Sequence, residues 1–82
     1  MNNKSQKTYN KIMSGKSDSN IKFNDLHNLL LNLGFETRQN GTSHIKYFHS
    51  KGAFTDLQIM HDGKAKPYQV KQVRQMLKDL NI

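Results

Sequence analysis

Residues 41–48 read Gly-Thr-Ser-His-Ile-Lys-Tyr-Phe, and this stretch sets the fold that we expect for the chain. Asn40 and Gly41 form a turn signal, and the residues after it alternate polar and apolar side chains, as a β-strand with one covered face does. Ile45 and Tyr47 would face the core. The residues on the other face would be His44, Lys46 and Phe48. A single histidine on a strand is most often an ordinary surface residue, so its neighbours decide its role.

The segment before this strand predicts an amphipathic helix that begins after Asn24 and ends before Gly34. Its apolar face is formed by leucines at helical spacing, Leu26, Leu29, Leu30 and Leu33. Asn24 is the expected N-cap, with Phe23 as a hydrophobic staple, and Gly34 is expected to end the helix. His27 lies off the leucine stripe, so we expect it to face solvent.

Three short strands and a last helix complete the expected fold. The strands are residues 35–39, 43–49 and 54–60, and their short turns make them an antiparallel meander. In the third strand, Leu57 and Ile59 share one face, and the other face holds Asp56, Gln58 and Met60. Pro67 fits the first position of the helix, where its missing N–H leaves no bond unmade. The inward residues of this helix are Val70, Val73, Leu77 and Leu80, and its polar face carries Lys71, Arg74 and Lys78.

Residues 1–20 are polar and rich in lysine, and they form an N-terminal extension before a domain at residues 21–82. Either a short helix over residues 6–13 docks through its apolar side chains, or the segment is a disordered lead. We favour the helix, ended by Gly15. The expected fold class is α+β, in the order α-β-β-β-α of double-stranded RNA-binding domains, with the helices packed on one face of the sheet.

The chain has 82 residues and a formal charge of +7, and its basic residues gather at the two ends. Five lysines accompany one aspartate in residues 1–22, and five basic residues accompany one aspartate in residues 64–82. This distribution favours a polyanion as partner over a basic surface without one. The lack of cysteine excludes disulfides and thiolate catalysis. No apolar stretch suits a membrane span or a signal peptide, so we expect a cytoplasmic protein.

Histidines and a basic loop are the other candidate features. The four histidines, His27, His44, His49 and His61, show no metal-ligand spacing, and we predict neither a metal nor another cofactor. The loop at residues 63–67, Gly-Lys-Ala-Lys-Pro, precedes a helix N-terminus and carries two lysines, which suits a phosphate group. Both features have an ordinary alternative. Glycine and proline are common turn residues, and a basic stripe on a helix such as the last one is as often simply exposed to solvent as in contact with a polyanion.

One reaction suits a histidine with lysines nearby, namely cleavage of RNA through its own 2′-hydroxyl. The 2′-oxygen is the nucleophile, so the protein supplies a proton acceptor or donor and cations for the phosphate. His44 would supply the first, since imidazole titrates near neutral pH. Lys46 on the same strand face, with Lys64 or Lys66 from the loop, would supply the second.

Several segments together resemble the HicA toxins of bacterial type II toxin–antitoxin systems. They are residues 15–18 (Gly-Lys-Ser-Asp), 23–35, 41–44 (Gly-Thr-Ser-His) and 63–74. The last is the most specific and is similar to HicA-like proteins with a short N-terminal extension. The family's catalytic histidine follows a Gly-Ser or Gly-Thr step, often as Gly-Ser-His-His. Ser43 replaces the first of these histidines here, so the resemblance assigns the role to His44.

The resemblance implies an mRNA interferase that arrests translation and is neutralised by a HicB-type antitoxin covering the active face. We therefore predict a metal-independent endoribonuclease with His44 as general acid or base. The residues predicted to contact RNA or its phosphates are Thr42, Lys46, Lys64, Lys66, Lys71 and Arg74. The N-terminal extension is a candidate homodimer interface. The alternatives are a non-catalytic double-stranded RNA-binding module, which needs no histidine on its sheet, and a protein-interaction adaptor.

Overall fold

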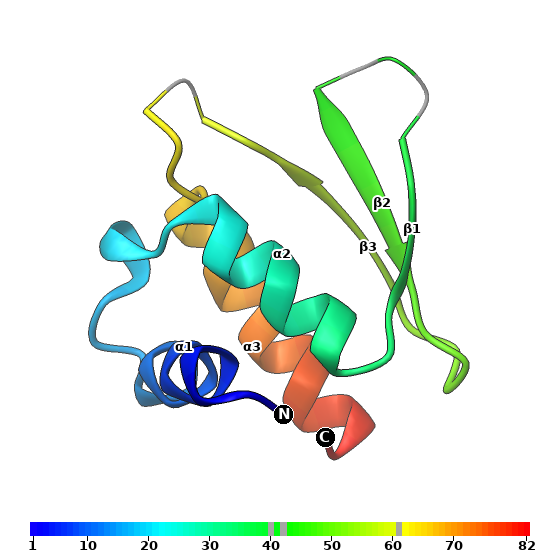
Figure 1. Cartoon of the computed structure of the whole chain (residues 1–82), viewed down its shortest axis with the longest axis horizontal. Coiled ribbons are helices and arrows are strands. Elements are labelled where there is room, and N and C mark those ends of the chain that lie inside the picture. Colours follow the sequence, from blue (N-terminus) through cyan, green and yellow to red (C-terminus); the bar gives the residue numbers. More distant parts are fainter. Residues whose placement is uncertain (40, 42, 61) are drawn as a thin grey trace.

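The structure is a computed structural model, and it describes residues 1–39, 41, 43–60 and 62–82. The elements in chain order are α1 (Asn3–Ser14), the 3-10 helix η1 (Asp18–Asn20), α2 (Phe23–Asn32), β1 (Glu36–Arg38), β2 (His44–Phe48), β3 (Phe54–Gln58) and α3 (Pro67–Leu80) (Figure 1). This order confirms the predicted α+β fold, α-β-β-β-α with a helical N-terminal extension. None of the described helices is long and apolar enough to cross a membrane.

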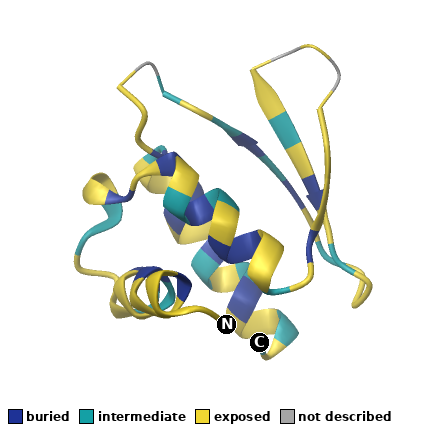
Figure 2. Ribbon diagram, viewed as in Figure 1, coloured by how far each residue is buried: buried dark blue, intermediate teal, exposed yellow. Residues whose placement is uncertain are grey.

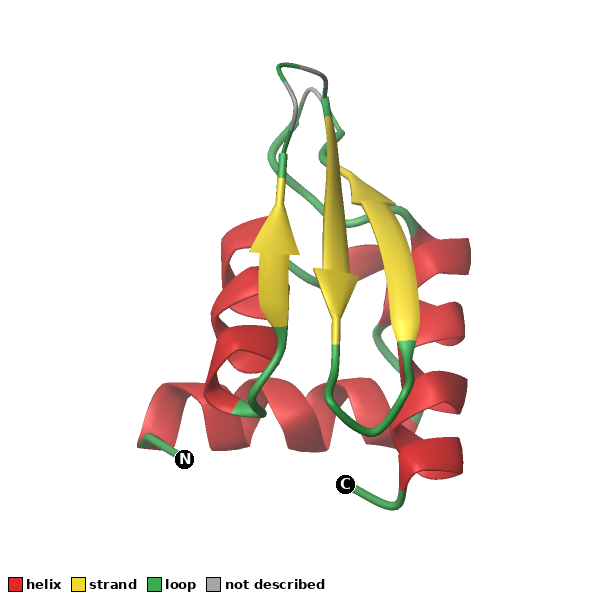
Figure 3. Ribbon diagram, turned by 90° about the vertical axis from the view of Figure 1, so that its right-hand side faces the viewer, coloured by secondary structure: helices red, strands yellow, loops and turns green. Residues whose placement is uncertain are grey.

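The three strands form one antiparallel sheet with β2 in the middle. Tyr47 of β2 lies opposite Thr37 of β1 and Thr55 of β3, which fixes the register of both strand pairs. Helices α2 and α3 lie on one face of this sheet. Figure 3 looks onto the other face, which the described helices leave open. Each strand is shorter than its predicted range.

The core lies between the sheet and the helices (Figure 2). Tyr47 of β2 and Leu57 of β3 are fully buried and point to the helices. The buried apolar residues of the helices are Ile12 of α1, Phe23, Leu26, Leu29 and Leu30 of α2, and Val70, Val73 and Leu77 of α3. The exposed residues of β2 are His44, Lys46 and Phe48. The predicted division of β2 into a covered and an open face is therefore confirmed.

Helix α2 ends where it was predicted to end, but it begins earlier than predicted. The helix begins at Phe23 instead of after Asn24, and no side chain caps it. The N–H of Phe23 donates to the carbonyl of Gly63 (3.0 Å), so the loop before α3 satisfies a group that a capping side chain would otherwise take. At the other end, Gly34 adopts a φ of +96° and stops the helix as predicted.

The N-terminal extension forms a helix that packs into the same core. α1 starts at Asn3, earlier than predicted, because the side chain of Asn2 accepts a hydrogen bond from a backbone N–H of the first turn (2.8 Å). Ile12 is fully buried, and the hydroxyl of Tyr9 donates to the carbonyl of Ile82 (3.1 Å). The helical alternative is thus the one observed, while the domain boundary at residue 20 stays a prediction.

Two side chains differ from their predicted environment. The expectation that His27 faces solvent is wrong, because its Nδ1 lies 2.7 Å from the hydroxyl of Tyr47. A buried hydroxyl needs a hydrogen-bond partner, and the histidine provides one. Ile59, expected to share a strand face with Leu57, is 44% exposed while Leu57 is buried. The reason is that β3 ends at Gln58, and the backbone of Ile59 pairs with Ala65, whose own side chain is buried there.

Candidate functional site

Alternate residues of the three strands lie on the uncovered side of the sheet, and the strand register sets them in rows. One row is Glu36, Phe48 and Phe54, the middle row is Arg38, Lys46 and Asp56, and the last row is His44 and Gln58. We call these residues the open face. It has an aromatic end and a polar end, and the histidine lies at the polar end.

A carboxylate holds His44 in place. Its Nδ1 lies 3.0 Å from Oδ1 of Asp56, diagonally across the pairing of β2 and β3. An ionised carboxylate only accepts hydrogen bonds, so the neutral ring carries its proton on Nδ1 and Nε2 is the basic nitrogen. The two side chains are 48% and 38% exposed, which leaves the pair accessible to a large substrate.

Lys46 adds positive charge beside this pair. It lies two residues from His44 on β2, directly opposite Asp56 of β3 and Arg38 of β1. Its side chain is exposed, and it shares the face of His44 as predicted. Sequence reasoning missed Asp56 as a site residue. The alternation of β3 placed it on the open face, but only the register of the two strands brings it to the histidine.

Lys66 reaches the polar end of the open face from the start of α3. Its Nζ donates to Oε1 of Gln58 (2.6 Å), the residue paired with His44, and lies 6.0 Å from the centroid of the Tyr68 ring. The side-chain amide of Gln58 in turn donates to the hydroxyl of Ser43 (3.0 Å). The structure therefore links two predicted residues, His44 and Lys66, through a glutamine that the sequence did not single out.

Lys64 lies in the loop before α3 and outside the open face. Its N–H donates to the carboxylate of Asp62 (3.0 Å), and its carbonyl accepts the N–H of Met60 (3.2 Å). Its backbone also pairs with that of Lys22, the residue before α2. Both lysines are exposed and their backbones are paired, so they form a basic spot at the loop.

Arg74 is an internal clamp. Its guanidinium donates two hydrogen bonds to the carboxylate of Asp18 (2.8 and 3.0 Å) and one to the carbonyl of Ile12 (3.0 Å). Only 14% of the Arg74 side chain is exposed. The hydrogen bond from Arg74 holds the pKa of Asp18 below its ordinary value, and the charge of Lys71 lowers it further. The predicted outer RNA contacts Lys71 and Arg74 thus belong to the side of α3 that packs on η1. The helices lie between η1 and the sheet (Figure 1).

Three residues of the sequence analysis lie outside the described part of the chain, namely Asn40, Thr42 and His61. The predicted phosphate contact through Thr42 therefore stays a prediction. Among the residues that the structure describes, no three histidine, aspartate or glutamate side chains gather in a group that could hold a metal ion.

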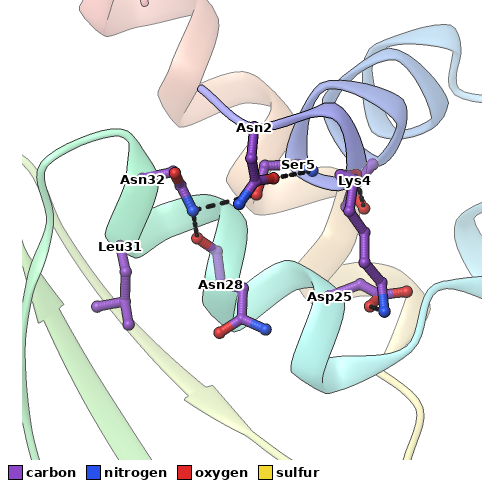
Figure 4. A pocket seen from close by; sticks show the side chains of 8 residues that line it. Asn2, Lys4, Ser5, Asp25, Asn28, Leu31 and Asn32 are labelled. Atoms are coloured by element: carbon purple, nitrogen blue, oxygen red, sulfur yellow. Dashed lines mark hydrogen bonds and ion pairs between the residues drawn. The ribbon is translucent and has the colours of Figure 1, made fainter.

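A polar cavity of about 200 Å³ lies between α1 and α2 (Figure 4). Its polar side chains bond one another across the gap. The amide of Asn32 donates to the hydroxyl of Ser5 (3.2 Å), and Nζ of Lys4 lies 3.4 Å from Asp25. None of the predicted site residues lines it. We therefore regard this cavity as a seam between two packed helices and not as a candidate site.

Comparisons with protein-family models, with curated proteins and with solved structures found no match to this chain. The chemistry available to the open face is that of its own residues. These are a histidine held by a carboxylate, a lysine beside it on the same strand, and a second lysine reaching in from α3.

Proposed function

We propose that this chain is an endoribonuclease that cleaves mRNA without a metal ion, and that it is the toxin of a HicA-like toxin–antitoxin pair. The observation that carries the proposal is the contact of His44 with Asp56, half-exposed on a sheet face with Lys46 beside it. A histidine whose proton is fixed on Nδ1 can accept another through Nε2. The similarity of residues 63–74 to HicA proteins supports the same function.

The proposed reaction uses a nucleophile that RNA itself provides. The 2′-oxygen attacks the neighbouring phosphorus and the bond from phosphorus to the 5′-oxygen breaks, which leaves a 2′,3′-cyclic phosphate and a 5′-hydroxyl. Nε2 of His44 takes the proton of the 2′-hydroxyl and then releases it to solvent, while the departing 5′-oxygen takes a proton from water. Asp56 orients the ring and stabilises the imidazolium. Lys46 offsets the negative charge that grows on the phosphate oxygens.

Further cations would guide the RNA to this position. Lys66 lies at the start of α3, where the helix dipole favours an anion, and its hydrogen bond to Gln58 ties it to the row of His44. Lys64 and Lys22 would attract the phosphate backbone of the RNA from a greater distance, so their contribution to RNA affinity should fall as salt is added. Arg74 has no role in this proposal because its guanidinium is engaged with Asp18.

The proposed protein partner is a HicB-type antitoxin with an acidic surface that covers the open face. A chain with a net charge of +7 attracts an acidic protein for the same reason that it attracts RNA. The proposal also places the protein in the cytoplasm, where mRNA is translated.

The rival function is a non-catalytic module that binds double-stranded RNA. Such modules recognise the shape of the RNA duplex and contact phosphates and 2′-hydroxyls across its minor groove. This mode of binding needs no histidine on the sheet. The contact between His44 and Asp56 favours the nuclease, because a purely binding surface gains nothing from an oriented imidazole.

The test compares the wild-type protein with His44→Ala and Lys78→Ala on a labelled mRNA in EDTA. We expect the wild type to produce fragments. His44→Ala should cleave the RNA at least about 100-fold more slowly, because it loses the general base. Lys78→Ala is the control for loss of an exposed basic side chain on α3 and should cleave like the wild type.

The binding behaviour in the same experiment separates the two functions. Circular dichroism first confirms that His44→Ala keeps the wild-type fold. If the wild type leaves the RNA intact but both proteins retard it equally on a native gel, the nuclease proposal fails and a binding module is left.

A further inference from the structure

Two phenylalanines lie side by side at the aromatic end of the open face. Phe48 of β2 and Phe54 of β3 are paired across the strands, with ring centroids 5.2 Å apart, and they are 37% and 53% exposed. Adjacent exposed rings form a continuous apolar surface, which a folded protein seldom leaves uncovered without a use. The rings point away from the buried Tyr47 and Leu57, so packing of the core does not account for them.

A guanidinium lies against one of these rings. Cζ of Arg38 is 5.8 Å from the centroid of Phe48, within the range of a cation–π contact. Arg38 is also the cross-strand neighbour of Lys46. Two cations, Arg38 and Lys46, therefore lie between the histidine and the aromatic pair, in a row that also holds Asp56. Glu36 lies at the outer end of the aromatic row.

We infer that Phe48 and Phe54 form a stacking platform for a nucleobase of single-stranded RNA. Every base has an apolar face that can lie on an aromatic ring, and cations beside the rings pair with the phosphates. A base inside a duplex already stacks on both neighbours and cannot reach the rings. The inference rests on the proposed function for its cleavage step, and it narrows the substrate to unpaired RNA.

The distance along β2 sets where the platform lies relative to the cleaved bond. Phe48 and His44 are four residues apart on one strand face, which corresponds to about 13 Å at the usual rise of a β-strand. The stacked base should therefore lie a few nucleotides away from the phosphate that His44 attacks.

A partner protein with an apolar surface is the other possible occupant of these rings. RNA is favoured because the row next to the platform holds the two cations Arg38 and Lys46 with the single carboxylate of Asp56, and because the chain carries a charge of +7. An apolar protein patch would gain little from a guanidinium beside it.

The test measures binding of a single-stranded 2′-O-methyl RNA, which cannot be cleaved through its 2′-oxygen. We expect Phe54→Ala to weaken its affinity roughly 5- to 150-fold, the range found for loss of one stacked base. Leu31→Ala, which truncates an exposed leucine of α2, is the matched control and should bind like the wild type. The same RNA annealed into a duplex should bind more weakly than the single strand.

A fluorescence experiment reports stacking directly. The chain contains no tryptophan, so Phe54→Trp introduces a single indole at the platform. Addition of the single-stranded RNA should quench its fluorescence, while the indole of Leu31→Trp should respond little.

The outcomes separate this inference from the proposed function. Unchanged RNA affinity in Phe54→Ala, with no quenching in Phe54→Trp, would overturn the platform even if His44-dependent cleavage is observed. Loss of affinity for an acidic partner protein but not for RNA would overturn it too, in favour of a protein occupant. Weakened RNA binding in Phe54→Ala by a protein that cleaves nothing would support the platform and reject the nuclease.

Discussion

Among single side chains, Asp56 determines what His44 can do. A histidine alone on an exposed strand turns freely and can carry its proton on either nitrogen. The 3.0 Å contact with the carboxylate restricts both the ring orientation and the position of the proton. The difference between a surface imidazole and a positioned base is therefore one aspartate on the neighbouring strand.

We predict that Asp56→Asn lowers kcat by about tenfold or more while KM changes little. An amide keeps the shape of the carboxylate but can also donate a hydrogen bond, so the ring can take the wrong tautomer. Steady-state cleavage of labelled RNA measures both constants. Glu36→Gln is the control, since it removes the other carboxylate of the open face at a distance from the histidine. Equal losses in the two variants would show that only the charge of the face matters.

Alternation along β2 was enough to place His44 and Lys46 on the open face, because side chains of a strand point to opposite faces in turn. Asp56 could not be matched with them from the sequence. Its partner depends on the register of β3 against β2, which the intervening turn sets and the residue pattern leaves open. The structure supplies that register.

Tyr47, whose side chain is buried between the sheet and the helices, gives a second prediction. Burial raises the pKa of Tyr47 well above its ordinary value of 10.0, and its hydroxyl contacts His27. Above about pH 10 the unfolded chain loses this proton and the folded chain keeps it, so the free energy of unfolding falls as pH rises. Tyr47→Phe should remove this part of the slope and cost about 1–3 kcal/mol at neutral pH, because His27 loses its partner. Urea unfolding of both proteins from neutral pH to above pH 10 tests this prediction. If Tyr47→Phe shows the same dependence of unfolding free energy on pH as the wild type, the hydroxyl of Tyr47 is not the buried group responsible.

For the helices and strands, the main connection is the clamp of Arg74. It ties α3 to η1 and to the end of α1. The helix boundaries that residue type predicts correctly are Gly15, Gly34 and Pro67, each of which favours its backbone position by itself. The role of Arg74 and the start of α2 were missed because each depends on a partner far along the chain, Asp18 in one case and Gly63 in the other.

The contact between Arg74 and Asp18 should make the free energy of unfolding depend on pH in the acid range. The pKa of Asp18 is depressed below its ordinary value of 3.8, so its contribution is present above that pH and is lost as pH falls through the folded value. We predict that Asp18→Asn lowers the free energy of unfolding by about 1–3 kcal/mol at neutral pH, with a smaller difference in strong acid.

Denaturant unfolding from neutral pH into acid measures this difference. Asp25→Asn is the control, because among the described residues Asp25 forms an ion pair with the exposed Lys4 and such pairs contribute little. A deficit in Asp18→Asn that stays constant into strong acid would be inconsistent with an ionised clamp.

Across the whole fold, the N-terminal extension is part of a single core. The order of helices and strands followed from periodicity and turn residues, since these are local signals. The docking of α1 was favoured from the apolar side chains of its sequence, but its partners were not predicted, because contacts such as that of Tyr9 with Ile82 join the two ends of the chain. Ile12 is buried among residues of α2 and α3.

We predict that Ile12→Ala lowers the free energy of unfolding by about 2–5 kcal/mol, the usual cost of such a cavity. Unfolding should stay a single transition when it is followed by circular dichroism in urea. Lys7→Ala, on the exposed side of α1, should change stability by about 0.5 kcal/mol or less. If Ile12→Ala left the main transition unmoved, α1 would have to be a separate appendage.

The chemical ends of the RNA fragments test the proposed reaction most directly. A labelled mRNA incubated with the protein in EDTA should give fragments that end in a 2′,3′-cyclic phosphate and a 5′-hydroxyl. The same sequence with 2′-deoxy nucleotides should stay intact, and His44→Ala should release almost no fragments from either substrate. Intact RNA with the wild-type protein, or fragments that carry 3′-hydroxyl and 5′-phosphate ends, would contradict attack by the 2′-oxygen with His44 as its base.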